Sequence, residues 1–251
     1  MNAVILAAGR GERLRPFTQH QHKCLLEFGG VSLLRRHLLA LPRVGIESIS
    51  IVTGYLANQV ESEVLTTGCD SAVDLIQNGN YELGSALSLL RASAAFRNRP
   101  CLIMDADILF PLKMLRQLVE ADFPNCLLVD GRLEDTGEEV KVVASSERRV
   151  TELGKRVGAS SGRICGECVG IFKFSSKAGI LLERALHAAV RFNPRVEYEQ
   201  VFDQLLGDID IRCVETGDLP WLEIDFSHDV ERAREVVWPM IRKTEETPEG
   251  K

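Results

Sequence analysis

The sequence predicts a three-layer α/β/α fold built on a mixed, mainly parallel sheet. Short apolar segments alternate with segments of helical periodicity through the first half of the chain, which is typical of parallel strands joined by helical crossovers. The chain has 251 residues, 45% hydrophobic and 26% charged, which is enough for one large core. After residue 125 the rhythm changes to short strand-like segments and turns, so we also expect a small β-rich insert in the second half.

Each element of the first half follows from its own residue pattern. Four segments of strand length are rich in apolar and β-branched residues, as expected where both faces of a sheet are covered, and they span residues 2–8, 48–54, 72–78 and 101–107. Four segments repeat apolar residues every three or four positions, and they span residues 31–41, 56–65, 85–96 and 112–121. In such a sheet, functional side chains gather at the carboxyl ends of the strands.

The second half is read in the same way. We expect strands within residues 126–132, 140–155, 166–174 and 210–215, and helices over residues 177–190, 198–206 and 228–241. Asp225 or Ser227 could cap the last helix. We therefore predict a single domain over residues 1–243 and a disordered polar tail over residues 244–251.

Composition limits the partners and the compartment. A formal net charge of −6 and a pI near 5.5 argue against a nucleic-acid binder, so any phosphate recognition should be local. The sequence has no apolar run near membrane-spanning length and no signal-peptide pattern, so we expect a cytoplasmic protein that does not bind a membrane. Seven cysteines fit reduced thiols, and the pair Cys165 and Cys168 lacks further ligands at zinc spacing. The oligomeric state is open, with a homodimer as one option.

Two glycines directly follow the first strand. Gly9 and Gly11 stand where glycine lets backbone N–H groups approach an anion closely. A Walker loop would need Lys and Ser or Thr after Gly11, where this chain has Glu12 and Arg13. A dinucleotide fingerprint would need a third small residue, where this chain has Leu14. The loop therefore suits a phosphate but matches neither of these patterns.

Two pairs of carboxylates mark a candidate metal site. Asp105 and Asp107 end an apolar strand, and the alternation of an extended segment would place both on one face. Glu223 and Asp225 repeat the same spacing near the end of the chain. Chemistry between two phosphorylated groups normally needs Mg²⁺ held by carboxylates. Each pair is therefore a candidate group of metal ligands.

The stretch LAAGxGxRLxPxT, from Leu6 to Thr18, followed by Lys23, resembles the signature loop of the nucleotidyltransferase superfamily. The resemblance implies a Rossmann-like fold and an enzyme that joins a nucleoside triphosphate to a phosphorylated metabolite. It implies that Arg13 and Lys23 contact the phosphates, whose charge a guanidinium and an ammonium can offset. His22 stands where the family usually has Pro. The loop residues implied in holding the base and the triphosphate are Leu6, Ala7, Ala8, Gly9 and Gly11.

Further segments resemble the branch of this superfamily that contains the phosphocholine, aminoethylphosphonate and inositol-phosphate cytidylyltransferases. These segments are NGNYELGSALSLLRA, GECVGIFKF, YEQVFDQLL and WLEID. The resemblance implies that Asp107 and Asp225 bind Mg²⁺. The other implied nucleotide contacts are Asn78, Gly84, Ser85 and Asp105, with the N–H groups at Gly84 and Ser85 facing the base or α-phosphate. The implied acceptor contacts are Lys155, Glu167, Glu199 and Glu223, with a carboxylate near Glu167 facing a cationic head group.

The resulting hypothesis is an Mg²⁺-dependent nucleotidyltransferase that joins CTP to a small phosphorylated or phosphonylated acceptor and releases pyrophosphate. Arg13, Lys23 and Asp107 are the expected catalytic residues, acting through positioning and charge stabilisation. One alternative is a sugar-1-phosphate nucleotidylyltransferase that uses UTP, dTTP or GTP. Another is a non-catalytic nucleotide-binding regulatory subunit. The sequence does not identify the acceptor.

Overall fold

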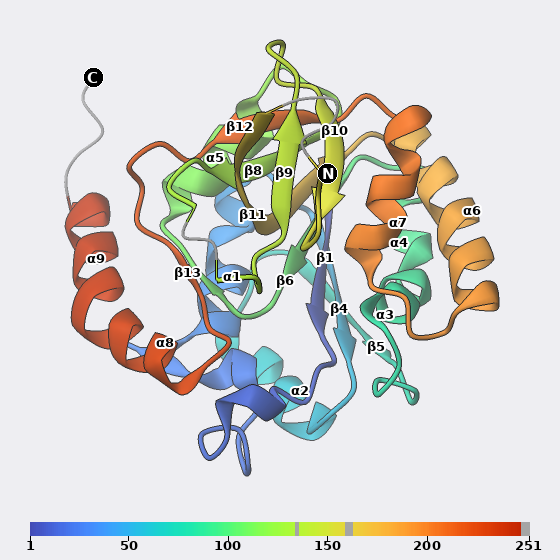
Figure 1. The fold of residues 1–251 in the computed structure, drawn as a ribbon. Coiled ribbons are helices and arrows are strands. Elements are labelled where there is room, and N and C mark those ends of the chain that lie inside the picture. Colours follow the sequence, from blue (N-terminus) through green and yellow to red (C-terminus); the bar gives the residue numbers. More distant parts are fainter. Residues whose placement is uncertain (134–135, 159–162, 247–251) are drawn as a thin grey trace.

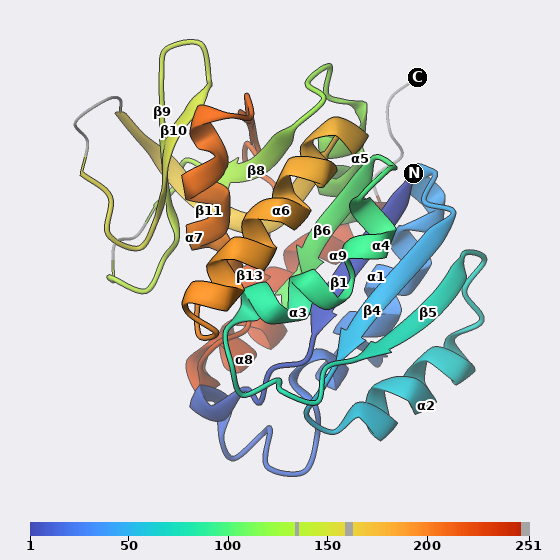
Figure 2. The ribbon, with the colours of Figure 1, turned by 90° about the vertical axis from the view of Figure 1, so that its right-hand side faces the viewer.

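The computed structural model describes residues 1–133, 136–158 and 163–246, and there it confirms the predicted three-layer fold. A central sheet lies between two layers of helices (Figure 1, Figure 2). In the described part of the chain, the sheet consists of β1 (Asn2–Ala7), β4 (Ser48–Thr53), β5 (Ala72–Gln77), β6 (Cys101–Asp105), β8 (Cys126–Asp130), β9 (Lys141–Ala144), β10 (Val150–Gly154), β11 (Arg163–Phe174) and β12 (Arg212–Glu215).

The strand order brings the predicted functional segments to one edge of the sheet. The order is β10-β9-β11-β6-β1-β4-β5, with β8 pairing β11 and β12 off this path. β1 is parallel to β4 and β6, and its register places Leu6 opposite Asp105. β11 is antiparallel to β6, β8 and β9, which makes the sheet mixed and forms the expected β-rich insert. The loop after β1 therefore lies beside the end of β6.

Two hydrophobic cores join the sheet to its helices. One core contains residues of α1 (Leu33–Ala40), α2 (Ala57–Thr67) and α5 (Leu112–Glu120). The other contains residues of α3 (Ser85–Arg91), α4 (Ser93–Phe96), α6 (Ser176–Phe192) and α7 (Tyr198–Gln204). Along β1, Ala3 and Ile5 belong to the first core and Val4 belongs to the second. The strand is apolar without interruption because both of its faces are buried.

A third, smaller core lies beside the carboxyl edge of the sheet. It is built on α8 (Ser227–Arg232), a π-helical turn (Ala233–Val237) and α9 (Trp238–Glu246). Leu14 of the glycine-rich loop and Ile224 are both fully buried in it. Two short ladders adjoin this core, pairing β13 (Leu222–Glu223) with β7 (Ile108–Leu109) and β2 (Glu27–Phe28) with β3 (Val31–Ser32). The third core therefore holds the glycine-rich loop and the C-terminal carboxylates on one support.

Several expected boundaries differ from the structure. The helix expected over residues 85–96 is two helices, because the chain forms tighter turns on both sides of Ala92. The expected final helix is interrupted by the π-helical turn. Residues 244–246 belong to α9, so the predicted disordered tail is wrong for them, and residues 247–251 lie outside the described residues. Of the helices in the described ranges, none has the length and hydropathy needed to cross a bilayer.

Candidate active site

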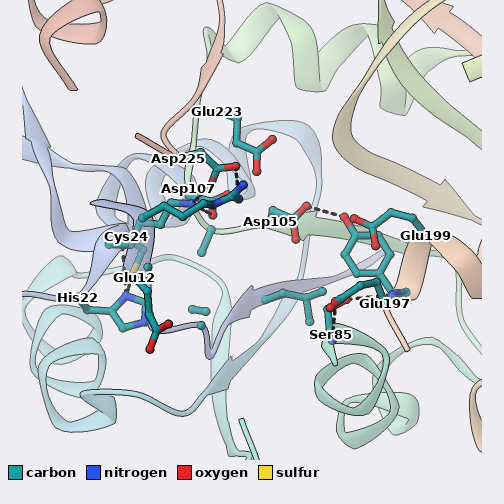
Figure 3. Close-up of a pocket in the computed structure, with 18 residues that line it drawn as sticks. Glu12, His22, Cys24, Ser85, Asp105, Asp107, Glu197, Glu199, Glu223 and Asp225 are labelled. Atoms are coloured by element: carbon teal, nitrogen blue, oxygen red, sulfur yellow. Dashed lines mark hydrogen bonds and ion pairs between the residues drawn. The ribbon is translucent and has the colours of Figure 1, made fainter. Parts of the chain in front are cut away.

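A cleft of about 500 Å³ opens at the carboxyl ends of β1 and β6. Figure 3 shows side chains from the glycine-rich loop, β6, α7 and the segment before α8 pointing into it. The predicted site residues that line the cleft are Leu6, Ala7, Gly9, Gly11, Arg13, Lys23, Ser85, Asp105, Asp107, Glu199, Glu223 and Asp225. Residues from distant parts of the sequence thus converge on one cavity.

The glycine-rich loop has a fixed shape. Gly11 adopts φ +57°, and a Cβ there would lie 3.1 Å from the Thr18 side chain and 3.4 Å from Lys23 Cβ. The Thr18 hydroxyl donates a hydrogen bond to the Gly11 carbonyl at 2.6 Å, and the buried Leu14 anchors the next turn. Gly11 is therefore needed both for its left-handed conformation and for the close approach of the Lys23 segment.

Lys23 connects the two predicted metal ligands. Its Nζ lies 2.7 Å from an oxygen of Asp107 and 2.5 Å from an oxygen of Asp225. Burial alone would lower the pKa of Lys23, but the two aspartates raise it above its ordinary value. The ammonium is therefore charged, and it offsets part of the negative charge of both carboxylates.

Glu223 is a third carboxylate of this group. Oxygens of Asp107, Glu223 and Asp225 lie within 4.8 Å of one another. Burial, followed by the charges of Asp107 and Asp225, raises the pKa of Glu223 well above its ordinary value. Asp107 Oδ1 is buried and has no hydrogen-bond partner among the described residues. Three crowded oxygen donors could hold a hard divalent cation, and Glu223, predicted as an acceptor contact, is one of the three.

The backbone around Asp225 is held by the start of α8. Asp229 Oδ2 accepts hydrogen bonds from the backbone N–H groups of Asp225 at 2.9 Å and Phe226 at 2.7 Å. The expectation that Asp225 or Ser227 caps this helix is therefore wrong, because Asp229 reaches back to make these bonds. The Asp225 side chain is left free to pair with Lys23 and, at 2.6 Å, with Arg13. Burial opposes ionisation, but Lys23 and Arg13 lower the pKa of Asp225 below its ordinary value.

Asp105 faces a different wall of the cleft. β6 ends at Asp105 and the chain turns at residues 106–107, so the expectation that Asp105 and Asp107 share one face of an extended segment is wrong. Asp105 Oδ2 accepts a hydrogen bond from the Tyr198 hydroxyl at 2.5 Å (Figure 3). Burial, then the charge of Asp107, raises the pKa of Asp105 well above its ordinary value.

Glu199 continues this wall. Its Oε2 is buried and has no hydrogen-bond partner within the described ranges. Burial raises the pKa of Glu199 to about 7, and the charge of Glu197 adds to the effect. A carboxyl group in this state is poised between its neutral and charged forms at physiological pH. Asp105 and Glu199 therefore form an acidic wall beside the group of Asp107, Glu223 and Asp225.

The start of α3 is tied to the start of α7. The Ser85 N–H donates to the Glu197 carboxylate at 2.9 Å, and the Ser85 hydroxyl accepts from the Tyr198 N–H at 2.9 Å. The Gly84 N–H donates to the Pro194 carbonyl. These groups, expected to face the nucleotide, are thus engaged within the protein in this structure. Gly84 is required by packing, since a Cβ there would lie 2.0 Å from the Val196 carbonyl oxygen.

Some predicted residues lie outside the cleft lining. Asn78 is fully buried, donates to the Ser88 hydroxyl at 3.0 Å and holds the turn after β5. Lys155 is half exposed and pairs with Glu138 Oε2 at 3.0 Å; the same oxygen lies 2.9 Å from Arg13 Nη1. The remaining predicted residues that do not line the cleft are Ala8, Gly84 and Glu167.

Sequence reasoning missed several residues of the cleft wall, namely Glu12, His22, Cys24, Ala106, Glu197 and Tyr198. Glu197 and Gln200 form a capping box at the start of α7. This four-residue spacing could have placed Tyr198 and Glu199 in the first turn of the helix. It could not have shown that the turn faces β6.

Cys165 and Cys168 are close in sequence, but the thiol contact in the fold is between Cys165 and another cysteine. Cys165 Sγ lies 3.6 Å from Cys213 Sγ on β12, while Cys168 is buried on β11. The proximity of Cys165 and Cys168 in sequence therefore does not predict the thiol contact that the structure contains.

Comparisons with known proteins identify relatives of this chain. Residues 3–164 match the profile of the MobA-like NTP transferase domain. A CTP:phosphoglutamine cytidylyltransferase from Campylobacter jejuni is 27% identical over 253 residues, covering 92% of this chain and 98% of that protein. A 2-aminoethylphosphonate cytidylyltransferase from Lancefieldella rimae is 32% identical over 233 residues, covering 88% of each. The solved inositol-1-phosphate CTP transferase from T. maritima has the same fold, with a TM-score of 0.80 at 22% identity over 99% of this chain and 98% of that one. The chain therefore belongs to the MobA-like NTP transferase family of nucleotidyltransferase enzymes.

Proposed function

We propose that this enzyme transfers the cytidylyl group of CTP to a small phosphorylated or phosphonylated acceptor, with Mg²⁺ as cofactor and release of pyrophosphate. The observation that carries the proposal is the convergence of Lys23, Asp107 and Asp225 beside the glycine-rich loop. The names of the cytidylyltransferase relatives support the choice of CTP. A binding subunit would have little use for a complete set of metal carboxylates.

Asp107, Glu223 and Asp225 are the residues that would hold Mg²⁺. The unpartnered Oδ1 of Asp107 and the raised pKa of Glu223 support this assignment, because a divalent cation would offset charge that Lys23 alone does not. When bound, Mg²⁺ supplies charge stabilisation at the phosphates and orients them. Asp225 would then give up part of its interaction with Lys23.

The two cationic side chains of the cleft stabilise the leaving pyrophosphate. The acceptor phosphate or phosphonate oxygen attacks the α-phosphorus, a new P–O bond forms, and the bond from the α-phosphorus to the bridging oxygen of pyrophosphate breaks. Arg13 and Lys23 offset the charge that develops on pyrophosphate, and Gly9 and Gly11 let the backbone approach the phosphates. The attacking oxyanion carries no proton, so no general base is required.

The acceptor is proposed to carry a cationic group. Within the described residues, seven carboxylate side chains but only two permanent cations line the cleft. Asp105 and Glu199 are not among the proposed metal carboxylates, and Glu199 Oε2 is buried without a hydrogen-bond partner in the described ranges. An ammonium group would satisfy that oxygen and stabilise the ionised carboxylate. An amine-bearing phosphonate or phosphate ester has this chemistry.

The experiment that tests the function measures pyrophosphate release with Mg²⁺. CTP, UTP, dTTP, GTP and ATP are each combined with phosphorylated and phosphonylated acceptors that differ only in the presence of an amine. The proposal expects turnover with CTP and an amine-bearing acceptor. Turnover only with UTP, dTTP or GTP and a sugar 1-phosphate would assign the enzyme to the sugar branch. Nucleotide binding without turnover on any acceptor would favour a regulatory role.

A further inference from the structure

His22 occupies a buried position in the wall of the cleft, directly before Lys23. Its side chain is 2% exposed, and it lies beside Cys24 on the side of the cleft formed by the glycine-rich loop (Figure 3). Neither a charge nor a metal ligand is needed from it in the proposed chemistry. Its side chain instead caps the short 3₁₀ turn Lys23–Leu25.

The contacts of the His22 imidazole ring define its protonation state. Nδ1 accepts a hydrogen bond from the Cys24 backbone N–H at 3.2 Å and lies 3.0 Å from the Cys24 thiol. A nitrogen that accepts carries no proton, so the imidazole is neutral with its proton on Nε2. Burial lowers the pKa of His22 to about 4, and the Lys23 ammonium acts in the same direction while Asp107 opposes it. The cap is therefore intact at neutral pH.

Two contacts fix the turn through this residue. The Nδ1 atom caps the 3₁₀ turn, and the His22 backbone N–H donates to Gln59 Oε1 on α2 at 2.9 Å. Nε2 is buried and has no hydrogen-bond partner within the described residues. His22 thus caps the turn that presents Lys23 and ties it to α2.

Lys23 needs such support because a lysine side chain is long and flexible. Its ammonium must stay near both Asp107 and Asp225, at 2.7 and 2.5 Å, while remaining close to the nucleotide phosphates. We infer that His22 is a positioning residue for the nucleotide, which acts by fixing the backbone turn that aims the Lys23 ammonium into the cleft. The inference rests on the proposed function, since it assigns the Lys23 ammonium to the nucleotide phosphates.

The test is a double-mutant cycle on nucleotide affinity, measured by calorimetry with CTP and Mg²⁺. His22→Ala should weaken CTP binding about five- to tenfold, the effect of losing one capping interaction. His22→Asn, which keeps an acceptor near the Cys24 N–H, should recover most of the affinity. In a Lys23→Met background, His22→Ala should cause no further loss, because the residue acts through Lys23. Thermal unfolding of each variant checks that it is folded.

Each outcome decides a different question. Equal affinities for wild type and His22→Ala, or losses that add fully in the cycle, would overturn the positioning role while the proposed function stands. A wild type that binds none of the five nucleoside triphosphates would overturn the proposed function and this inference with it. If His22→Ala does not fold, His22→Asn and His22→Gln carry the test. The Asn variant should then bind CTP more tightly than the Gln variant, whose longer side chain carries its amide oxygen beyond the cap position, and equal affinities would overturn the inference.

Discussion

Replacing Lys23 by Met should destabilise the protein at neutral pH and make its stability depend on a divalent metal. The ammonium lies 2.7 Å from Asp107 and 2.5 Å from Asp225, and the Lys23 side chain is only 11% exposed. At an effective dielectric constant of about 20, each contact contributes about 6 kcal/mol before desolvation is counted. Desolvation of the three charges offsets most of this, and removing one partner of a buried ion pair costs about 3–5 kcal/mol in unfolding free energy.

The loss should shrink as the pH falls. Without the ammonium, three carboxylates remain within 4.8 Å of one another, and their repulsion raises the pKa of Glu223 further above its already raised value. A carboxyl group with a raised folded-state pKa destabilises the protein above its unfolded-state pKa of about 4. That penalty starts to shrink as the pH falls through the folded-state value, and it is gone below about 4. The lowered pKa of Asp225 adds to this effect only below its unfolded-state pKa of about 4, where the wild type begins to lose the ion pair.

Urea denaturation followed by circular dichroism measures both effects. Wild type and Lys23→Met are compared at about pH 8 and about pH 5 in EDTA, and at about pH 8 with Mg²⁺; about pH 5 lies near the unfolded-state carboxyl pKa, where the penalty is smaller. Lys113→Met is the control, because Lys113 is exposed on α5. An equal loss at both pH values, with no recovery in Mg²⁺, would refute the electrostatic argument and leave lost packing as the cause.

The remaining predictions concern the metal, the acidic wall and one packing contact. Asp107→Asn should lower turnover at least about a hundredfold in the pyrophosphate assay while circular dichroism stays native, because the variant loses a metal ligand's charge; near-normal turnover would remove Asp107 from the metal site. The KM for an amine-bearing acceptor should fall as the pH rises through about 7, where Glu199 ionises. Glu199→Gln should remove this dependence, and an unchanged profile would contradict the acidic-wall role. Gly84→Ala should cost about 1–3 kcal/mol in urea denaturation, because its Cβ would lie 2.0 Å from the Val196 carbonyl oxygen. Gly79→Ala, with no atom within 4 Å of its Cβ, should change stability by less than about 0.5 kcal/mol, and equal effects of the two changes would contradict the packing argument.

The sequence predicts those parts of the fold that local patterns encode. The central parallel strands β1, β4 and β6 are predictable because burial on both faces demands apolar runs. The pairing of β7 with β13 is not, because two-residue strands have no periodicity. That pairing sets Glu223 opposite Ile108, next to Asp107, so the sequence does not show that Glu223 approaches Asp107.

The residues of the site likewise fall into those that the sequence predicts and those that it does not. Arg13, Lys23, Asp107 and Asp225 can be predicted because each belongs to a motif of defined spacing. Tyr198 cannot, since its partner Asp105 is 93 residues away and nothing near Tyr198 in the sequence marks that contact. The contacts missed are those made by tertiary packing between elements whose own patterns are ordinary.

The excess of acidic side chains in the cleft predicts that a metal ion and a nucleotide bind cooperatively. Lys23 is already paired with Asp107 and Asp225, and Arg13 is paired with Asp225 and Glu138. A triphosphate that enters alone must compete with these carboxylates for both cations, within a cleft that has more acidic than basic side chains. If Mg²⁺ engages the carboxylates, Lys23 and Arg13 are released toward the phosphates. Metal and nucleotide should therefore bind cooperatively, and by linkage each should strengthen the other by the same factor. Calorimetric titration of CTP in EDTA and in Mg²⁺ measures that factor, and equal affinities under the two conditions would show that the cations are not held back by the carboxylates.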